Sequence, residues 1–303
     1  MSALVTLFAC LLLGIVCRRF ARLPEGIVPG INWWVLNIAL PALVLALVPK
    51  LRFESSLWLP AAGAFITFFG AWVLFASVGR MRGWSRGRIG CLTLVCGLGN
   101  TSFMGYPMIE ALHGRPGLGV AVVADQLGTF PLLAVGGIVV ASLYSGARPT
   151  VGAMARRLFT FPAFLALLAG IVVGWIGGWP PIVDGALEQV GRTLTPLALF
   201  SVGLQFRLHM EPGQAGALSL GLSWKLLLAP LLVLALGMAC GYGGLVLVVA
   251  VLQAAMAPMI SAAILADQYA LEPRLANTVL GAGIALSLFT IVGGNALLMS
   301  LAV

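Results

Sequence analysis

Apolar stretches long enough to cross a lipid bilayer follow one another along nearly the whole chain, and this recurrence excludes most folds. A bilayer core is about 30 Å thick, so a helix needs roughly 20 apolar residues to cross it. We count ten stretches, at residues 3–17, 27–48, 57–79, 87–112, 118–144, 159–176, 182–206, 216–239, 243–267 and 275–302. Charged residues make up only 9% of the chain, against about 25% in a soluble domain. The sequence therefore predicts an all-α membrane protein with ten transmembrane helices.

The basic residues are distributed unevenly between alternate loops. One side carries Arg18, Arg19, Arg22, Arg80, Arg82, Arg86, Arg88, Arg148, Arg156, Arg157, Arg207 and Arg274. The other side carries only Lys50, Arg52 and Arg115. Cytoplasmic loops of membrane proteins carry such an excess, so the net charge of +8 reflects topology and not a nucleic-acid partner. We predict a multi-pass protein of a bacterial inner membrane, with both termini on the periplasmic side.

Motifs of enzymes and metal sites are missing from the sequence. It contains no H-E-x-x-H, no phosphate-binding loop and no Ser/His/Asp arrangement with a buried histidine. The five cysteines lie in or beside apolar stretches, without metal-ligand spacing. We expect no enzyme activity, no metal and no organic cofactor, and leave coupling to H⁺ or Na⁺ open.

The two halves of the chain repeat one another at a nearly constant offset. Four pairs of matching short motifs begin at Phe8 and Phe164, Ile27 and Ile182, Pro107 and Pro258, and Val135 and Val292. The offsets between the members of each pair are 156, 155, 151 and 157 residues. Five helices per unit turn the second unit upside down, which gives an inverted repeat. The predicted parts are a first repeat at 1–146, a cytoplasmic connector at 147–158 and a second repeat at 159–303.

One pair of matching motifs contains a proline, which breaks helices, in each half of the chain. Pro107-Met108-Ile109-Glu110-Ala111 recurs as Pro258-Met259-Ile260-Ser261-Ala262. Proline removes a backbone hydrogen-bond donor and clashes with the preceding turn, so each motif is expected to interrupt the helix that contains it. Interrupted helices in corresponding positions of two halves point to a transporter's binding site. We expect the fourth and ninth helices to break and cross near the middle of the membrane.

The first break brings the most polar side chains. Asn100, Thr101 and Ser102 follow Gly97-Leu98-Gly99 and precede Pro107. Half-helices joined by extended backbone would direct free N–H groups and these side chains toward an anion. The alternative is a proline-kinked helix whose Ser and Thr bond to their own backbone.

The second break is poorer in polar groups. Gln253 and Ser261 flank Pro258, and small alanines separate them. Gln253 either contributes to the site or joins neighbouring helices by a hydrogen bond. The predicted site is therefore asymmetric, with the first break as its principal binder.

Charged residues inside apolar stretches are costly and indicate function by default. Lys225 either neutralises a carboxylate substrate, pairs with Asp125, or extends toward the membrane surface. Asp125, beside Gln126, is a candidate for proton coupling, because burial favours the protonated carboxyl group; the alternative is an interfacial position. Arg192 and Glu188 are spaced for an ion pair on one helix face.

The motif Gly99-Asn100-Thr101-Ser102-Phe103-Met104-Gly105-Tyr106-Pro107 resembles bacterial members of the auxin efflux carrier family. Further motifs that resemble this family begin at Pro196, Lys225 and Leu252. The resemblance implies the architecture of bile-acid:sodium symporters, with a scaffold part and a transport part that contains the crossover. It implies substrate contacts at Asn100, Pro107 and Pro258, and organic anions such as auxin, malate or malonate as substrates.

These patterns favour a secondary transporter of small carboxylates that works by alternating access. A sodium-coupled symporter and a non-transporting anion receptor are the alternatives. The expected partners are the anion and the lipid bilayer, and a homodimer through the Trp33-Trp34 segment stays open.

Overall fold

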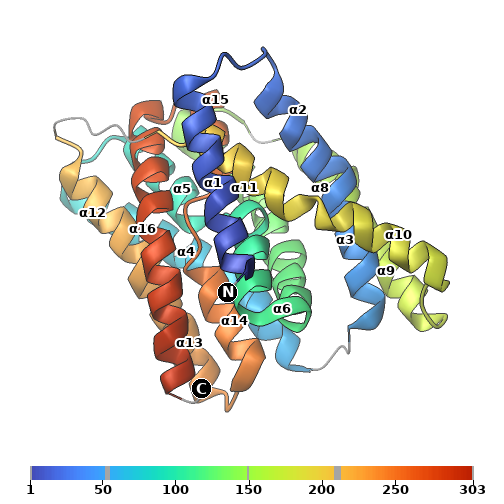
Figure 1. Cartoon of the computed structure of the whole chain (residues 1–303). Helices are drawn as coiled ribbons and strands as arrows, with labels where there is room; N and C mark the ends of the chain where they lie inside the picture. The colour runs from blue at the N-terminus through green and yellow to red at the C-terminus, as the bar shows by residue number, and fades with distance from the viewer. Residues whose placement is uncertain (1, 52–54, 149, 208–212, 302–303) are drawn as a thin grey trace. The chain divides into compact units, whose positions relative to one another are not determined.

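The structure is a computed structural model that describes residues 2–51, 55–148, 150–207 and 213–301. The described residues are almost entirely helical and contain no strand (Figure 1). This confirms the predicted all-α class. By their contacts the helices divide into two compact units: Met1–Glu54, Ser102–Val122 and Arg156–Phe206 form the first, and Ser55–Thr101, Val123–Ala155 and Arg207–Val303 form the second.

The first unit is built on close helix pairs. It contains α1 (Ser2–Phe20), α2 (Ile27–Trp34), η1 (Val35–Ala39), α3 (Leu40–Leu47), η2 (Val48–Lys50), most of α6 (Tyr106–Val123), α9 (Pro162–Trp175), α10 (Pro181–Arg192) and α11 (Leu194–Gln205). Helix α1 packs along α11, and α3 packs against α9 and α10. Gly14 and Gly203 lie where α1 meets α11, and a Cβ on either would overlap backbone atoms of the other helix. Small residues allow this close approach between membrane helices.

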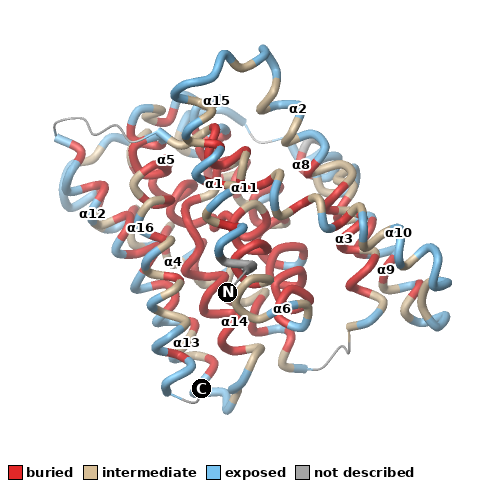
Figure 2. The backbone as a smooth tube through the Cα atoms, in the orientation of Figure 1, coloured by how far each residue is buried: buried red, intermediate tan, exposed pale blue. Residues whose placement is uncertain are grey.

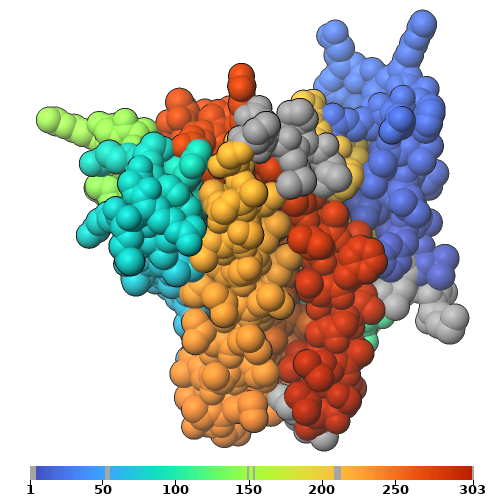
Figure 3. Space-filling model, turned by 90° about the vertical axis from the view of Figure 1, so that its left-hand side faces the viewer, coloured from blue at the N-terminus to red at the C-terminus, as the bar shows by residue number. Residues whose placement is uncertain are grey.

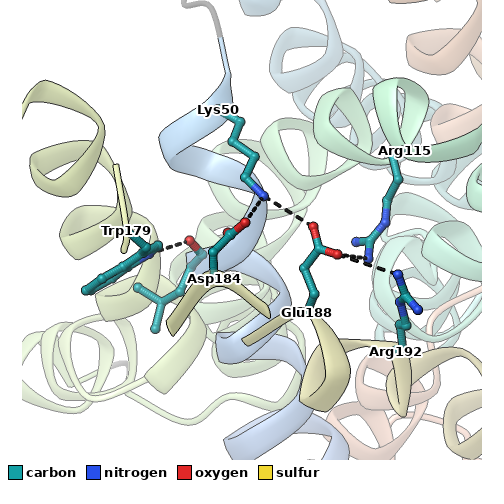
Figure 4. A network of polar contacts seen from close by, with 7 residues as sticks. Lys50, Arg115, Trp179, Asp184, Glu188 and Arg192 are labelled. Carbon is teal, nitrogen blue, oxygen red and sulfur yellow. Dashed lines mark hydrogen bonds and ion pairs between the residues drawn. The ribbon is translucent and has the colours of Figure 1, made fainter. Parts of the chain in front are cut away.

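A network of charged residues joins three parts of the first unit (Figure 4). Lys50 Nζ lies 2.7 Å from Asp184 Oδ2 and 3.2 Å from Glu188 Oε1. The guanidinium groups of Arg115 and Arg192 lie 3.6 and 3.5 Å from Glu188 Oε2. The predicted Glu188–Arg192 pair is therefore confirmed. Lys50 and Arg115 contact the same carboxylate, as expected for two loops on one side of the membrane.

The second unit surrounds two largely buried helices. It contains η3 (Ser55–Leu57), α4 (Trp58–Met81), α5 (Arg86–Gly97), η5 (Ala124–Thr129), η6 (Leu132–Gly137), α7 (Ile138–Ser145), α12 (Ala215–Ser223), η7 (Trp224–Leu228), α13 (Ala229–Ala239), α14 (Gly244–Ala254), α15 (Ile260–Gln268) and α16 (Pro273–Ser300). Buried residues follow most of α5 and α14 (Figure 2). Helices α12 and α16 run side by side at the surface (Figure 3). The exposed side chains of Leu286, Phe289 and Leu297 on α16 suit a lipid environment.

Four short π-helical segments each precede a proline by the same distance. Pro41, Pro107, Pro131 and Pro230 stand two residues after the ends of η1, η4 (Thr101–Gly105), η5 and η7, respectively. Proline has no N–H and its ring clashes with the carbonyl four residues earlier. A wider turn before the proline relieves this clash, and single π turns of this kind are frequent at functional sites.

The structure confirms a multi-pass membrane chain but not the count of ten spans. Within the described part of the chain, five helical stretches are long and apolar enough to cross a membrane, namely Ile27–Lys50, Ser55–Met81, Thr101–Ser145, Ala215–Ala239 and Pro273–Ser300. Helices α9 and α14 are apolar but shorter. The 45-residue stretch holds more than one straight helix, because Gly114 interrupts it with φ 65° and ψ −160°.

The inverted repeat stays a prediction. Each of the two contact units contains segments from both predicted repeats. Contacts show which helices pack together, whereas the repeat concerns which helices have similar sequences. Arg52, whose predicted counterpart is Arg207, lies outside the described residues. Helix α8 (Val151–Phe159) falls within the predicted connector and its last residue lies one beyond it.

Close packing of α1 on α11 predicts a position-specific response to added side-chain volume. We expect Gly14→Ala to destabilise the protein by about 1–3 kcal/mol through overpacking, seen as a lower melting temperature in detergent. The matched control is Gly185→Ala in α10, where a Cβ meets nothing within 4 Å. Alanine is a better helix former than glycine, so the control should melt at the same or a higher temperature. An equal response of both variants would contradict the packing argument.

Candidate anion site

Two backbone breaks in the second unit lie against each other. Helix α5 ends at Gly97 and α14 ends at Ala254, and each is followed by extended backbone. Asn100 N–H donates to Ala257 O at 2.8 Å, and Met259 N–H donates to Leu98 O at 3.1 Å. Gly99 and Pro258 form the bridge between these two bonds. The two breaks therefore satisfy part of each other's backbone, which an interrupted helix in a membrane requires.

A narrow cavity lies at this junction. Its walls come from α4, the end of α5, the first break, η4, η5, η7 and the end of α14, at Pro60, Ala64, Thr67, Gly97, Leu98, Gly99, Thr101, Ala124, Thr129, Lys225, Gln253 and Ala254. The space open to the centre of a water molecule is about 10 Å³, close to the minimum for one water. The cavity in this conformation is therefore too small for a dicarboxylate.

Lys225 is the charged residue in the cavity wall. Its side chain is buried, with 1% of the residue exposed, and Nζ donates to Ala254 O at 2.8 Å. That carbonyl ends α14, where the helix dipole favours a cation. The neighbouring Trp224 holds η7 in place by donating from Nε1 to Thr67 O at 3.1 Å. Among the described residues Lys225 forms no ion pair, so the direct pairing with Asp125 is not seen in this conformation.

Gly99 provides the space that the ammonium group occupies. A Cβ at this position would lie 2.9 Å from Lys225 Nζ and 3.4 Å from Gln253 O. Because the ammonium already bonds to Ala254 O, any side chain at position 99 would compete with it. Glycine at the break thus lets a cation approach the backbone closely.

Asp125 lies beside the cavity and is fixed at both oxygens. Thr101 Oγ1 donates to Oδ1 at 2.5 Å, and Gln126 Nε2 donates to Oδ2 at 2.8 Å. All three side chains are buried, so the surrounding protein shields the Asp125 carboxylate. Thr101 itself lines the cavity and connects Asp125 to it.

The predicted site residues fall into three groups. Thr101, Lys225 and Gln253 line the cavity; Asn100 and Pro258 form the backbone junction. Ser261 lies half-buried in the first turn of α15 and outside the cavity wall. Ser102 and Pro107 belong to the first unit, so their role at the site stays a prediction.

One local prediction was wrong. Pro107 does not interrupt its helix: the π turn η4 begins at Thr101 and continues into α6, whose second residue is Pro107. The break lies earlier, at Leu98 to Asn100. The wider turn absorbs the proline, while glycines at 97 and 99 release the helix.

Sequence reasoning missed several residues of the cavity wall, namely Gly99, Thr67 and Thr129. The sequence did carry a signal for three residues that were predicted. Thr101, Asp125 and Lys225 each stand five or six residues before a proline, within the turn that the proline widens. Thr67 and Thr129 lie in regular or π-helical segments without such a distinguishing pattern.

Polar side chains gathered at paired helix breaks in a multi-pass membrane chain are typical of a transporter. The comparisons with known proteins agree. A family model described as "Membrane transport protein" matches residues 1–293, and the chain belongs to this family. The resemblance to auxin efflux carriers is thereby confirmed, and the protein is a membrane transporter and not an enzyme.

Similar proteins come from archaea, bacteria and plants. An "Uncharacterized transporter" of Methanothermobacter thermautotrophicus is 25% identical, over 96% of this chain and 95% of its own length. The "Putative malonate transporter" of Rhizobium meliloti is 24% identical, over 94% and 92%. The "Probable auxin efflux carrier component 5c" of Oryza sativa subsp. japonica is 26% identical, over 70% and 75%.

The isolation of Lys225 predicts that the protein folds without its charge. Burying an ion costs several kcal/mol, whereas its hydrogen bond to Ala254 O contributes about 1.5–3 kcal/mol. We therefore expect Lys225→Met to melt in detergent at the same or a higher temperature than the wild type. The control is Lys50→Met, which removes two carboxylate contacts near the surface and should change melting little. A much lower melting temperature for Lys225→Met alone would assign Lys225 to the structure.

Proposed function

We propose that this protein is a secondary transporter of small organic anions, which bind at the cavity between the two breaks of the second unit. The observation that carries the proposal is the buried Lys225 ammonium group, which forms no direct ion pair with a carboxylate among the described residues. A charge of this kind is costly inside a membrane and indicates a ligand of opposite sign. The carboxylate of a substrate supplies that charge.

The surrounding groups favour an anion over a cation. Helix α15 begins at the second break, and helix N-termini carry partial positive charge. The wall contributes an ammonium group beside Gly99, where the backbone comes close. A sodium ion at the same place would be repelled by Lys225, so sodium coupling through this cavity is not favoured.

The names of two relatives narrow the substrate class. One is named as a malonate transporter and one as an auxin efflux carrier. Malonate, malate and auxin-like acids share an ionised carboxylate, which is the group that Lys225 recognises. We take small carboxylates of this kind as the substrates and choose malonate as the first compound to test.

The small size of the cavity supports alternating access. A space of about 10 Å³ admits no carboxylate, so binding requires a second conformation in which the cavity opens. We propose ten helices in two inverted repeats, with the second unit as the transport part, by elevator-like or rocking motion. The loop charges support a bacterial inner membrane with both termini outside the cytoplasm.

A flux assay with matched lysine variants tests the proposal. Purified protein in liposomes should take up radiolabelled malonate, and Lys225→Gln should lower the initial rate about 10- to 100-fold, since a charged hydrogen bond contributes about 1.5–3 kcal/mol. Asn100→Ala should also lower uptake, by altering the first break. Lys50→Gln serves as the control, because Lys50 belongs to the first unit's surface network.

The same assay separates the alternatives. Binding of malonate without flux would identify a receptor. Dependence of the rate on a sodium gradient would favour a sodium symporter. Undiminished uptake by Lys225→Gln, at equal amounts of inserted protein, would sink the proposed role of the lysine.

A further inference from the structure

Asp125 controls which way the Thr101 hydroxyl group points. Both groups are buried, and Asp125 Oδ1 accepts the hydrogen bond from Thr101 Oγ1 at 2.5 Å. A hydroxyl group has one proton to donate and two lone pairs. While Asp125 is ionised it takes that proton, so Thr101 presents only lone pairs to the cavity that it lines. An anion in the cavity would meet an acceptor where it needs a donor.

We propose that a proton on Asp125 reverses this hydrogen bond and thereby couples the binding of one proton to the binding of each anion. This inference rests on the proposed function, because it concerns the same cavity. Asp125 thus acts as a positioning residue: it touches Thr101, and Thr101 touches the substrate.

The proton can be followed through the step. A proton from water binds Oδ1, and the carboxyl group becomes neutral. The new O–H donates to Thr101 Oγ1, so the threonine's own proton turns into the cavity and donates to a carboxylate oxygen of the substrate. Release of the anion reverses both hydrogen bonds, and the proton leaves Asp125. No covalent bond to the substrate forms or breaks.

The charges of the site support the same coupling. The empty site holds one positive charge on Lys225 and one negative charge on Asp125, which sum to zero. An anion that enters alone leaves at least one negative charge uncompensated in a buried place, at a cost of several kcal/mol. One proton on Asp125 removes one of these charges. Loading with a proton is therefore the less costly route.

Charged residues also lie on the elements around η5. Helix α4 and η6 pack against η5, and their charged residue is Arg80, near the end of α4. Lys225 is the charged residue in the cavity wall, and the thiol of Cys96 on α5 lies close enough to Lys225 to interact with it. Thr101, which contacts both Asp125 and the cavity, therefore carries the change in charge of Asp125 to the site.

Gln126 can adapt to either state of Asp125. Its Nε2 donates to Oδ2 at 2.8 Å, while its Oε1 is buried and accepts no hydrogen bond from the described residues. With the proton on Oδ1, Oδ2 remains an acceptor and keeps the hydrogen bond from Gln126 Nε2. The carboxyl group therefore finds a hydrogen-bond partner in both charge states, as a buried titrating group needs.

Proton uptake on substrate binding tests the coupling directly. Malonate is added to the purified protein in weakly buffered detergent solution, at a pH where malonate is fully ionised, and a pH indicator dye records protons taken up. The wild type should take up about one proton for each malonate bound, and its affinity should fall about tenfold per pH unit above the titration of Asp125. Asp125→Asn should bind malonate without proton uptake and without this pH dependence.

Matched variants separate this inference from the proposed function. The control Asp267→Asn removes an exposed carboxylate of α15 and should take up protons like the wild type. Thr101→Ser keeps the hydroxyl group and should keep the coupling, whereas Thr101→Val should lose it. Equal proton uptake by Asp125→Asn and the wild type overturns the inference while leaving anion transport intact. Failure of the wild type to bind malonate counts against the proposed function instead.

The hydrogen bond between Asp125 and Thr101 can also be tested without substrate, even if the wild type does not bind malonate. Infrared spectroscopy during acid titration of the purified wild type should show a protonated carboxyl band that Asp125→Asn lacks. In Thr101→Val the band should appear at a different pH, because Asp125 has lost its hydroxyl partner. The same midpoint in Thr101→Val and the wild type would show that Thr101 does not sense the charge of Asp125, and would overturn the inference.

Discussion

The hydrogen bonds between the two backbone breaks are the constraint on which the site depends. A bilayer offers no water to an unpaired N–H or C=O, so an interrupted helix is stable only where protein or a cavity satisfies it. Here the bonds from Asn100 to Ala257 and from Met259 to Leu98 let each break satisfy the other. The carbonyl of Ala254 is satisfied by Lys225. The polar centre of the second unit therefore follows from backbone pairing, before any substrate is considered.

Proline determines where polar side chains can enter the helices around this centre. Pro131 and Pro230 each follow a π turn, and those turns hold Asp125 and Lys225. A π turn widens the helix by one residue, so side chains there are placed differently from those of a regular helix. Proline thus acts before its own position in the chain. This explains why the π turn that begins at Thr101 precedes Pro107, while the helix continues through the proline itself.

Sequence reasoning predicted the class of fold and the type of site, but only part of the geometry. Long apolar stretches and loop charges suffice for a multi-pass helical protein. The helix breaks near Asn100 and Pro258 follow from glycine and proline. The partner of Lys225 does not, because a main-chain carbonyl of α14 has no sequence signature. The pairing of Thr101 with Asp125 also depends on contacts between separate segments, which local patterns do not encode.

The carbonyl of Ala254 gives the empty site a partner that an anion can replace. A buried ammonium with no acceptor would be too costly to retain, whereas a neutral acceptor satisfies it in part. A substrate carboxylate adds the attraction of its full negative charge to the hydrogen bond with the ammonium group. Lys225 gains from exchanging Ala254 O for a substrate, but only by the difference between the two bonds. A transporter must release what it binds, and this exchange keeps the affinity modest because the empty state is itself satisfied.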